Sequence, residues 1–231
     1  MTELTEEMYA IFDRNEFSFK KLKQQYSEDE LAQVKTDFKE VWQTWKEVNL
    51  NVYQKLPQDK FAKVHVESWT NGWNLRDHYW AAFRLNTMAD KSPCIGVMLD
   101  KKQLQVYLMF QHYKSEKRGD NPEQYNELLA DIPTWAKNHK INNWYLWDKN
   151  EMEFADHLSL SEYLADTKKQ TLFNEEARKT SFLLGKFAFR NQDQVKDMEE
   201  FILNGIEQLL PLYGKLECEI SLSKTSNCAN N

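Results

Sequence analysis

Hydrophobic side chains in the first quarter of the chain recur at helical spacing. Ser27 and Glu30 form the S-x-x-E pattern of a capping box, and an apolar stripe follows them on one face. The pattern predicts a helix over residues 28–52 with a charged opposite face, preceded by a short helix over residues 4–12. The stripe consists of Leu31, Val34, Phe38, Val41, Trp42, Trp45 and Val48.

After Pro57 the period changes from helical spacing to strict alternation, which is typical of strands with one covered face. Two apolar runs separated by the polar residues 100–103 predict an antiparallel hairpin, in which Asp100 and Lys102 are solvated turn charges. Gly185 is a candidate bulge in a later strand. The predicted strands are residues 61–69, 79–85, 94–99, 104–113, 144–147 and 181–190.

Further helices are indicated by caps and apolar periodicity. Asp120 or Asn121 before Pro122 predicts a helix to about residue 135, disturbed near its end by Pro133. Ser159 with Glu162 predicts another over 160–168, and a last helix over 192–210 opens at Asn191 and ends before Pro211. Since helices and strands do not alternate as βαβ units, we expect an α+β fold with a mainly antiparallel sheet flanked by helices. The expected organisation is a single domain over 1–220 and a C-terminal tail over 221–231.

Composition narrows the function classes. The 231 residues contain only six glycines, none spaced as G-x-G, so no dinucleotide-binding loop is expected. An acidic N-terminus without an apolar run and the lack of long apolar stretches predict a cytoplasmic protein with no membrane role. Three widely spaced cysteines suggest reduced thiols, and Cys94 reads as a small buried hydrophobe.

The densest group of aromatic and polar residues lies in WTNGWNLRDHYWAAFR, residues 69–84. Indole faces next to amide and guanidinium donors suit a planar or anionic ligand. The competing interpretation is a connection held to the core by its aromatics, with Arg76 simply pairing with Asp77. The candidate ligand-binding residues are Trp69, Trp73, Asn74, Arg76, His78 and Arg84, with His65, His112 and Lys114 from neighbouring segments.

Other chemistry is less well supported. His65, His78 and His112 lie on or beside predicted strands, but ordinary strand-surface histidines explain them better than a metal site, so no metal is predicted and the cofactor is unknown. Residues 111–118 are locally basic beside aromatics, as nucleic acid or a phosphorylated ligand would require. The net charge of −6 opposes nucleic-acid binding.

Three hypotheses remain open. The leading one is a binding module with an aromatic, partly basic cleft for a small-molecule or phosphorylated ligand. The second is an enzyme acting on a phosphorylated or nucleic-acid substrate, with His78 or His65 as general acid or base and Arg76 or Arg84 holding the anion. The third is a protein-interaction or oligomer-forming domain that uses the exposed edge of the 28–52 helix.

The run IFDRNEFSFKKLKQQYS, with the segments KVHVESWTNGWNLRDHYWAAFRL and SPCIGVMLDKKQLQVYLMFQHY, resembles a family of uncharacterised bacterial proteins from Haemophilus, streptococci and lactic-acid bacteria. The resemblance covers nearly the whole chain. Some members carry a glucose-6-phosphate dehydrogenase label, which the glycine pattern here contradicts. The strands, hairpin and basic-aromatic end are also similar in pattern to N-terminal specificity domains of modification-dependent restriction systems, which implies nucleic-acid binding as an alternative.

Overall fold

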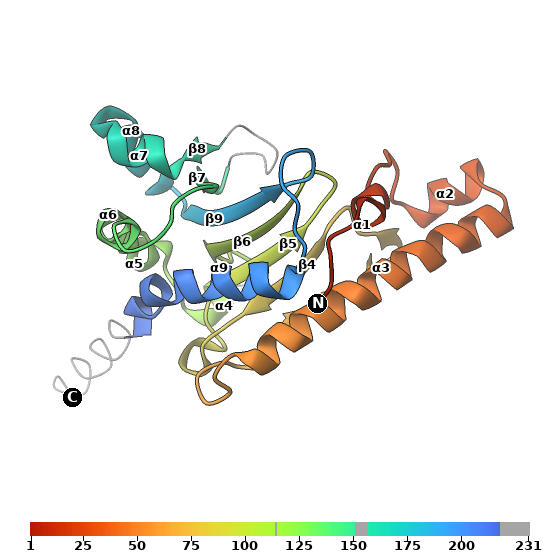
Figure 1. The fold of residues 1–231 in the computed structure, drawn as a ribbon, viewed down its shortest axis with the longest axis horizontal. Coiled ribbons are helices and arrows are strands. Elements are labelled where there is room, and N and C mark those ends of the chain that lie inside the picture. Colours follow the sequence, from red (N-terminus) through yellow and green to blue (C-terminus); the bar gives the residue numbers. More distant parts are fainter. Residues whose placement is uncertain (114, 151–156, 218–231) are drawn as a thin grey trace.

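A seven-stranded antiparallel sheet forms the centre of the computed structural model, which describes residues 1–113, 115–150 and 157–217 (Figure 1). The strand order is β1-β4-β5-β6-β9-β7-β8. These strands are β1 (His65–Val66), β4 (Tyr79–Phe83), β5 (Pro93–Leu99), β6 (Gln103–Phe110), β7 (Trp144–Asp148), β8 (Leu158–Ser159) and β9 (Phe182–Phe189). A separate two-stranded hairpin consists of β2 (Thr70–Asn71) and β3 (Asn74–Leu75). The predicted α+β class with a mainly antiparallel sheet is confirmed.

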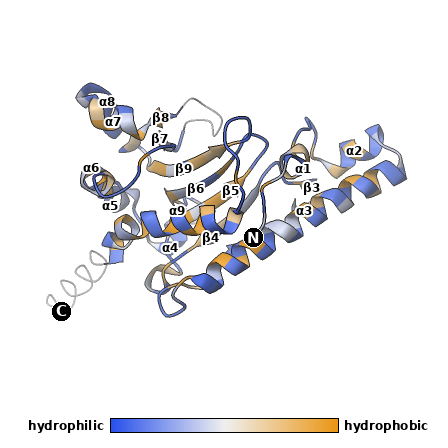
Figure 2. Cartoon of the chain, viewed as in Figure 1, coloured by the Kyte–Doolittle hydropathy of each residue, from blue (hydrophilic) through white to orange (hydrophobic). Residues whose placement is uncertain are grey.

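The helices pack around this sheet. They are α1 (Glu6–Ala10), α2 (Phe19–Gln25), α3 (Glu28–Lys55), α4 (Ser115–Arg118), α5 (Pro122–Asn126), α6 (Ile132–Ala136), α7 (Leu160–Ala165), α8 (Thr167–Ala177) and α9 (Met198–Tyr213), with 3-10 turns η1 (Asn86–Met88) and η2 (Glu127–Ala130). The predicted capping box of α3 is present, because Ser27 accepts from the Glu30 N–H and Glu30 accepts from the Ser27 N–H. Figure 2 shows apolar and polar positions interleaved along α3, whose buried residues include Phe38, Trp45 and Val52.

The hairpin of β5 and β6 is confirmed, with Val97 opposite Val106 at its middle. The expectation of solvated turn charges fails at Asp100, which is fully buried and accepts hydrogen bonds from the N–H groups of Lys102 and Gln103. A carboxylate at this place satisfies the donors of a tight turn, so it is structural. Cys94 is buried as predicted.

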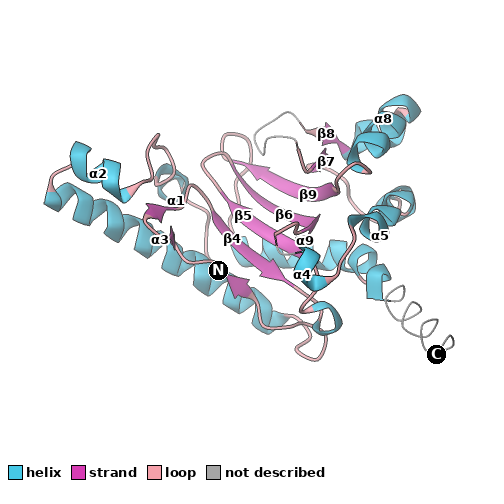
Figure 3. Cartoon of the chain, turned by 180° about the vertical axis from the view of Figure 1, so that it is seen from behind, coloured by secondary structure: helices cyan, strands magenta, loops and turns pink. Residues whose placement is uncertain are grey.

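The two faces of the sheet differ. Helices α3 and α9 cover one face, and in Figure 3 the strands face the viewer with these helices behind them. On the opposite face large rings lie across small residues. A Cβ at Gly96 or Gly185 would come within 3.0 Å of the Tyr107 side chain, so both positions give that ring its space. Gly185 pairs in continuous register with Tyr107 and Tyr145, so the predicted bulge is wrong. The buried side chains on this face form a hydrophobic cluster of their own, which contains Trp80, Ala82, Cys94, Met98, Tyr107, Trp147, Leu183 and Phe187.

Helix α9 begins later than predicted. Its N-cap is Asp197, which accepts from the N–H groups of Glu199 and Glu200, so Asn191 belongs to the preceding loop. Pro211 lies inside the helix and Gly214 caps it. Gly205 lets α9 approach the sheet closely, since a Cβ there would lie 2.8 Å from the Val106 Cβ.

Three other elements differ from the sequence predictions. The strand expected over 61–69 is reduced to β1, a two-residue edge strand beside β4. The helix expected from residue 122 is divided into α5, η2 and α6, because Pro133 lacks an N–H donor and lies in the first turn of a new helix. The helix expected over 160–168 ends at Ala165, and Asp166 caps a second helix.

Within the described ranges, no helix combines the length and apolarity that a bilayer crossing requires. The predicted tail over 221–231 lies outside the described residues.

Candidate functional site

The predicted residues on the β2–β3 hairpin lie together at one end of the molecule. The two-residue turn Gly72–Trp73 has a positive φ at Gly72 only, the pattern of a type II′ turn. This turn presents Trp73 to solvent with an exposed fraction of 86%. Trp69 is half-buried and meets the Phe19 ring edge-to-face, with centroids 6.5 Å apart.

A cavity of about 440 Å³ lies beside this hairpin, and we call it the hairpin cleft. Asn74, Arg76 and His78 line it, so the structure brings three predicted residues together. Its charges are paired. Arg76 Nη1 lies 2.6 Å from Glu67 Oε2, and His78 Nδ1 lies 2.7 Å from Asp77 Oδ1.

The pairing differs from the expected Arg76–Asp77 contact, because Glu67 reaches Arg76 across the hairpin base. Arg76 Nε also donates to the Ser68 carbonyl oxygen at 2.9 Å. The hydrogen bond from His78 lowers the pKa of the Asp77 carboxyl. The guanidinium of Arg76 is therefore held by contacts to Glu67 and Ser68 within the protein.

The other predicted residues lie elsewhere. Arg84, on the segment after β4, donates to Gln111 Oε1 at 2.7 Å and to the Lys91 carbonyl oxygen at 3.3 Å. The His65 ring meets Trp80 edge-to-face at 6.3 Å. Neither residue lines the hairpin cleft.

His112 and Lys114 follow the far end of β6. His112 Nε2 lies 2.9 Å from Ser181 Oγ, and burial, followed by the charge of Lys149, lowers the pKa of its imidazole. Lys114 lies outside the described residues. Among the residues whose positions the structure describes, no group of three His, Cys, Asp or Glu side chains is placed to hold a metal ion.

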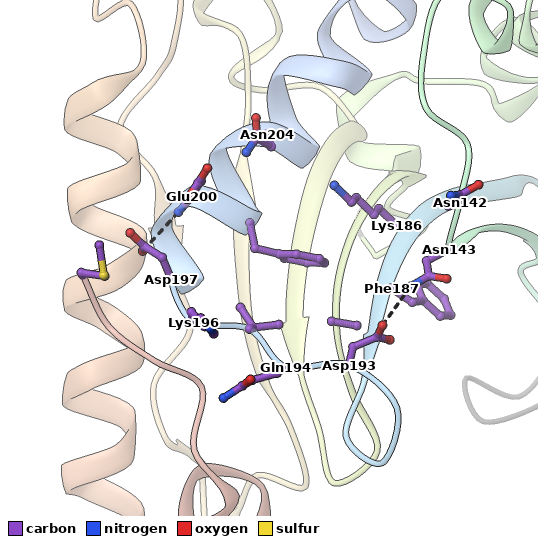
Figure 4. A pocket seen from close by; sticks show the side chains of 14 residues that line it. Asn142, Asn143, Lys186, Phe187, Asp193, Gln194, Lys196, Asp197, Glu200 and Asn204 are labelled. Atoms are coloured by element: carbon purple, nitrogen blue, oxygen red, sulfur yellow. Dashed lines mark hydrogen bonds between the residues drawn. The ribbon is translucent and has the colours of Figure 1, made fainter.

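A larger cavity, of about 570 Å³, lies between α9, β9 and the loops at their ends, and we call it the α9–β9 pocket (Figure 4). Lys186 enters it from β9, Asn204 from α9, and Asn142 and Asn143 from the loop before β7. Because β9 pairs with β7 at Trp144 opposite Lys186, the sheet places the two asparagines beside the lysine strand.

Lys186 is half-buried and has no ionic partner among the described residues. None of the ion pairs found among the described residues includes it. Its Nζ lies 5.2 Å from the centroid of the Phe201 ring. Burial lowers the pKa of this amine, and no charged neighbour contributes to the shift.

One wall of the pocket has an unusual backbone. Asn143 has a φ of 60°, and it is the one non-glycine residue with a positive φ in the described part of the chain. Its Nδ2 donates to Asp193 Oδ1 at 3.2 Å and its carbonyl oxygen accepts from the Phe187 N–H at 2.9 Å. These contacts hold the left-handed conformation, which asparagine tolerates better than most residues.

Sequence reasoning missed this pocket. Lys186 is a single cation within the apolar strand FLLGKFAF, and that signal could have marked it. Asn142, Asn143 and Asn204 carry no local motif, and their convergence depends on strand pairing.

The comparison with known proteins covers nearly all of the residues that the structure describes. A protein-family model matches residues 4–216. The chain belongs to this family. A relative from Haemophilus influenzae, described as an uncharacterized protein, is 28% identical over 215 residues, which cover 93% of this chain and 99% of the relative. The family is therefore one of uncharacterised bacterial proteins, as the sequence resemblance implied.

Proposed function

We propose that the protein is a binding module for a small polar ligand with a negatively charged group, held in the α9–β9 pocket. The observation that carries the proposal is Lys186, a half-buried amine that has no ionic partner among the described residues and lies at a cavity of about 570 Å³. An unpaired ammonium that has lost part of its water gains more from an anionic partner than a solvated one does.

The asparagines give the pocket neutral hydrogen-bonding groups. Asn142 and Asn204 are exposed on opposite sides of Lys186, from the loop before β7 and from α9. An amide offers both donors and an acceptor, so it can orient hydroxyl, carbonyl or carboxylate groups. The Phe201 ring adds an apolar surface, which fits the mixed lining of ligand sites.

None of the pocket carboxylates forms an ion pair with Lys186 in the described part of the chain. Asp193 accepts from Asn143 and from the Phe189 N–H, and Asp197 caps α9. Lys196 and Glu200 are exposed at the rim. The proposal therefore assigns the anionic end of the ligand to Lys186.

The test is a thermal-shift screen of the purified chain against oxo acids, sugar phosphates, nucleotides and inorganic phosphate. A ligand at 100 times its Kd stabilises the folded state by about 2.7 kcal/mol, which shifts the midpoint measurably. Lys186→Met should weaken a ligand found in this way about ten- to a hundredfold, the cost of one hydrogen bond to a charged group.

The matched control is Arg76→Met in the hairpin cleft, which removes a cation of similar exposure to solvent outside the pocket. We expect it to leave the affinity unchanged. Equal affinity of the wild type and Lys186→Met for every binding anion would overturn the proposal, as would a screen without any shift.

The hairpin cleft remains a second candidate because Trp73 is 86% exposed there. A planar ligand stacked on this indole, with Asn74 and His78 beside it, is the arrangement expected from the sequence. Loss of binding in Trp73→Ala but not in Lys186→Met would favour this cleft. The enzymatic alternative with His78 or His65 predicts turnover that His78→Ala or His65→Ala abolishes. A cytoplasmic location remains part of the proposal.

A further inference from the structure

The surroundings of Lys186 favour a nucleophilic amine. The inference drawn from them rests on the proposed function of the α9–β9 pocket. Two other lysines are held by carboxylates: Lys55 Nζ lies 2.6 Å from Glu199 Oε2, and Lys169 Nζ lies 2.7 Å from Glu162 Oε1. These contacts raise the pKa of both lysines and keep them charged. Lys186 is in the opposite environment.

The surroundings of Lys186 combine access with partial loss of water. Its side chain leaves β9 on the face that α9 covers, where the Phe201 ring lies 5.2 Å from Nζ. The same amine lines the open α9–β9 pocket, so a small molecule can reach it. Since burial lowers the pKa of Lys186, its neutral form is more populated at neutral pH than that of an exposed lysine.

We propose that Lys186 forms a reversible imine with an aldehyde or 2-oxo acid bound in the α9–β9 pocket. The nitrogen lone pair attacks the carbonyl carbon, and the carbonyl oxygen takes up a proton, which gives a carbinolamine. One proton then moves from the nitrogen to the hydroxyl group, the carbon–oxygen bond breaks, water leaves, and a protonated imine remains. Addition of water reverses both steps, so no oxidant, reductant or cofactor is needed.

The amides provide the recognition that this chemistry requires. In an oxo acid, the carbonyl carbon takes the place at Lys186 that the anionic group of a non-carbonyl ligand occupies, and the carboxylate can accept a hydrogen bond from Asn142 or Asn204. An oxo acid thus presents to the pocket both an anionic group and an electrophile. The class of ligand narrows from any small anion to carbonyl compounds.

The experiment uses the full chain with glyoxylate as the probe and sodium borohydride to reduce the imine to a stable amine. Peptide mapping by mass spectrometry then compares Lys186 with Lys23, an exposed lysine on α2, in the same molecule. We expect Lys186 to be modified several-fold faster than Lys23 at pH 7, and its rate to level off below the usual lysine pKa of about 10.4, because burial lowers the pKa of Lys186. This internal comparison needs no variant, so a folding defect cannot obscure it.

Two variants separate the reaction from simple binding. Lys186→Arg keeps a positive charge but is not nucleophilic at this pH, so it should lose the adduct and keep the thermal shift given by non-carbonyl anions. Lys23→Arg should change neither. Equal modification of Lys186 and Lys23 with binding intact overturns the imine and leaves the binding module standing. A wild type without any thermal shift and without selective modification overturns both.

Discussion

The hairpin cleft and the α9–β9 pocket each contain a cation, but the two cations have different partners. In the cleft, Arg76 lies 2.6 Å from Glu67 and donates to Ser68, so its charge joins the two ends of the hairpin at its base. In the pocket, Lys186 has an aromatic ring and amides around it and no carboxylate in ion-pair contact. A segment dense in polar residues can therefore serve the structure as readily as a function. A partly buried charge without an ionic partner costs stability, and a bound ligand of opposite charge would offset that cost.

Gly205→Leu should have the largest effect, because it separates the helix of the pocket from the sheet. The space for a Cβ is already occupied by Val106, at 2.8 Å. Overpacking of this kind costs about 3 kcal/mol, measured as the free energy of unfolding in urea. Val106→Ala should recover part of the loss. Unchanged stability in Gly205→Leu would show that α9 does not pack as closely as described.

Arg76→Ala should cost about 1–2 kcal/mol, since it removes a charged hydrogen-bond partner and leaves Glu67, 25% exposed, without it. A double-mutant cycle with Glu67→Gln measures the coupling energy between Arg76 and Glu67.

Lys186→Met should leave the stability unchanged or slightly raise it, because burial in the folded state disfavours the charge of Lys186. If Lys186→Met destabilised the chain more than Arg76→Ala, the contrast between the two regions would fail.

These two cations also show how far the sequence could predict the molecule. Helix α3 and the β5–β6 hairpin follow from local signals, a capping box at Ser27 and two apolar runs around a polar turn. The site residues do not. Arg76 finds its partner nine residues away because the chain turns at Gly72, and Lys186 and Asn142 line the same pocket because β9 pairs with β7.

The start of α9 shows a second reason for error. Both Asn191 and Asp197 are acceptable N-caps, and apart from Val195 the sequence between them is polar. The structure selects Asp197, because the intervening loop carries Asp193, which accepts from Asn143 and from the Phe189 N–H. Tertiary contacts therefore determine which of the two caps is used. The same Asp193 also lines the α9–β9 pocket.

Trp73→Ala should change stability by less than about 0.5 kcal/mol, because the indole is 86% exposed and lies at a turn. Thermal unfolding of the variant measures this. A large loss would make Trp73 part of the structure and would remove the stacking role expected for it.

The smallest effect concerns pH. Burial of His112 lowers its folded-state pKa below the usual value of about 6.5, so the unfolded chain takes up the proton first as the pH falls. The contribution of His112 to stability is complete above that value and is lost as the pH falls through the folded-state pKa. His112→Gln should therefore lose less stability between pH 7.5 and pH 5 than the wild type. Identical losses in urea unfolding would contradict this.

Lys186 is an accessible amine without an ionic partner among the described residues. Titration of the Lys186 amine tests this description directly. Carbon-13 NMR of protein labelled at the lysine ε-carbons follows each amine from pH 6 upward, and Lys186→Arg assigns the signal. We predict that the Lys186 signal titrates at lower pH than the exposed lysines, as burial requires. A Lys186 signal that titrates together with those of Lys55 and Lys169, which carboxylates hold charged, would contradict the account.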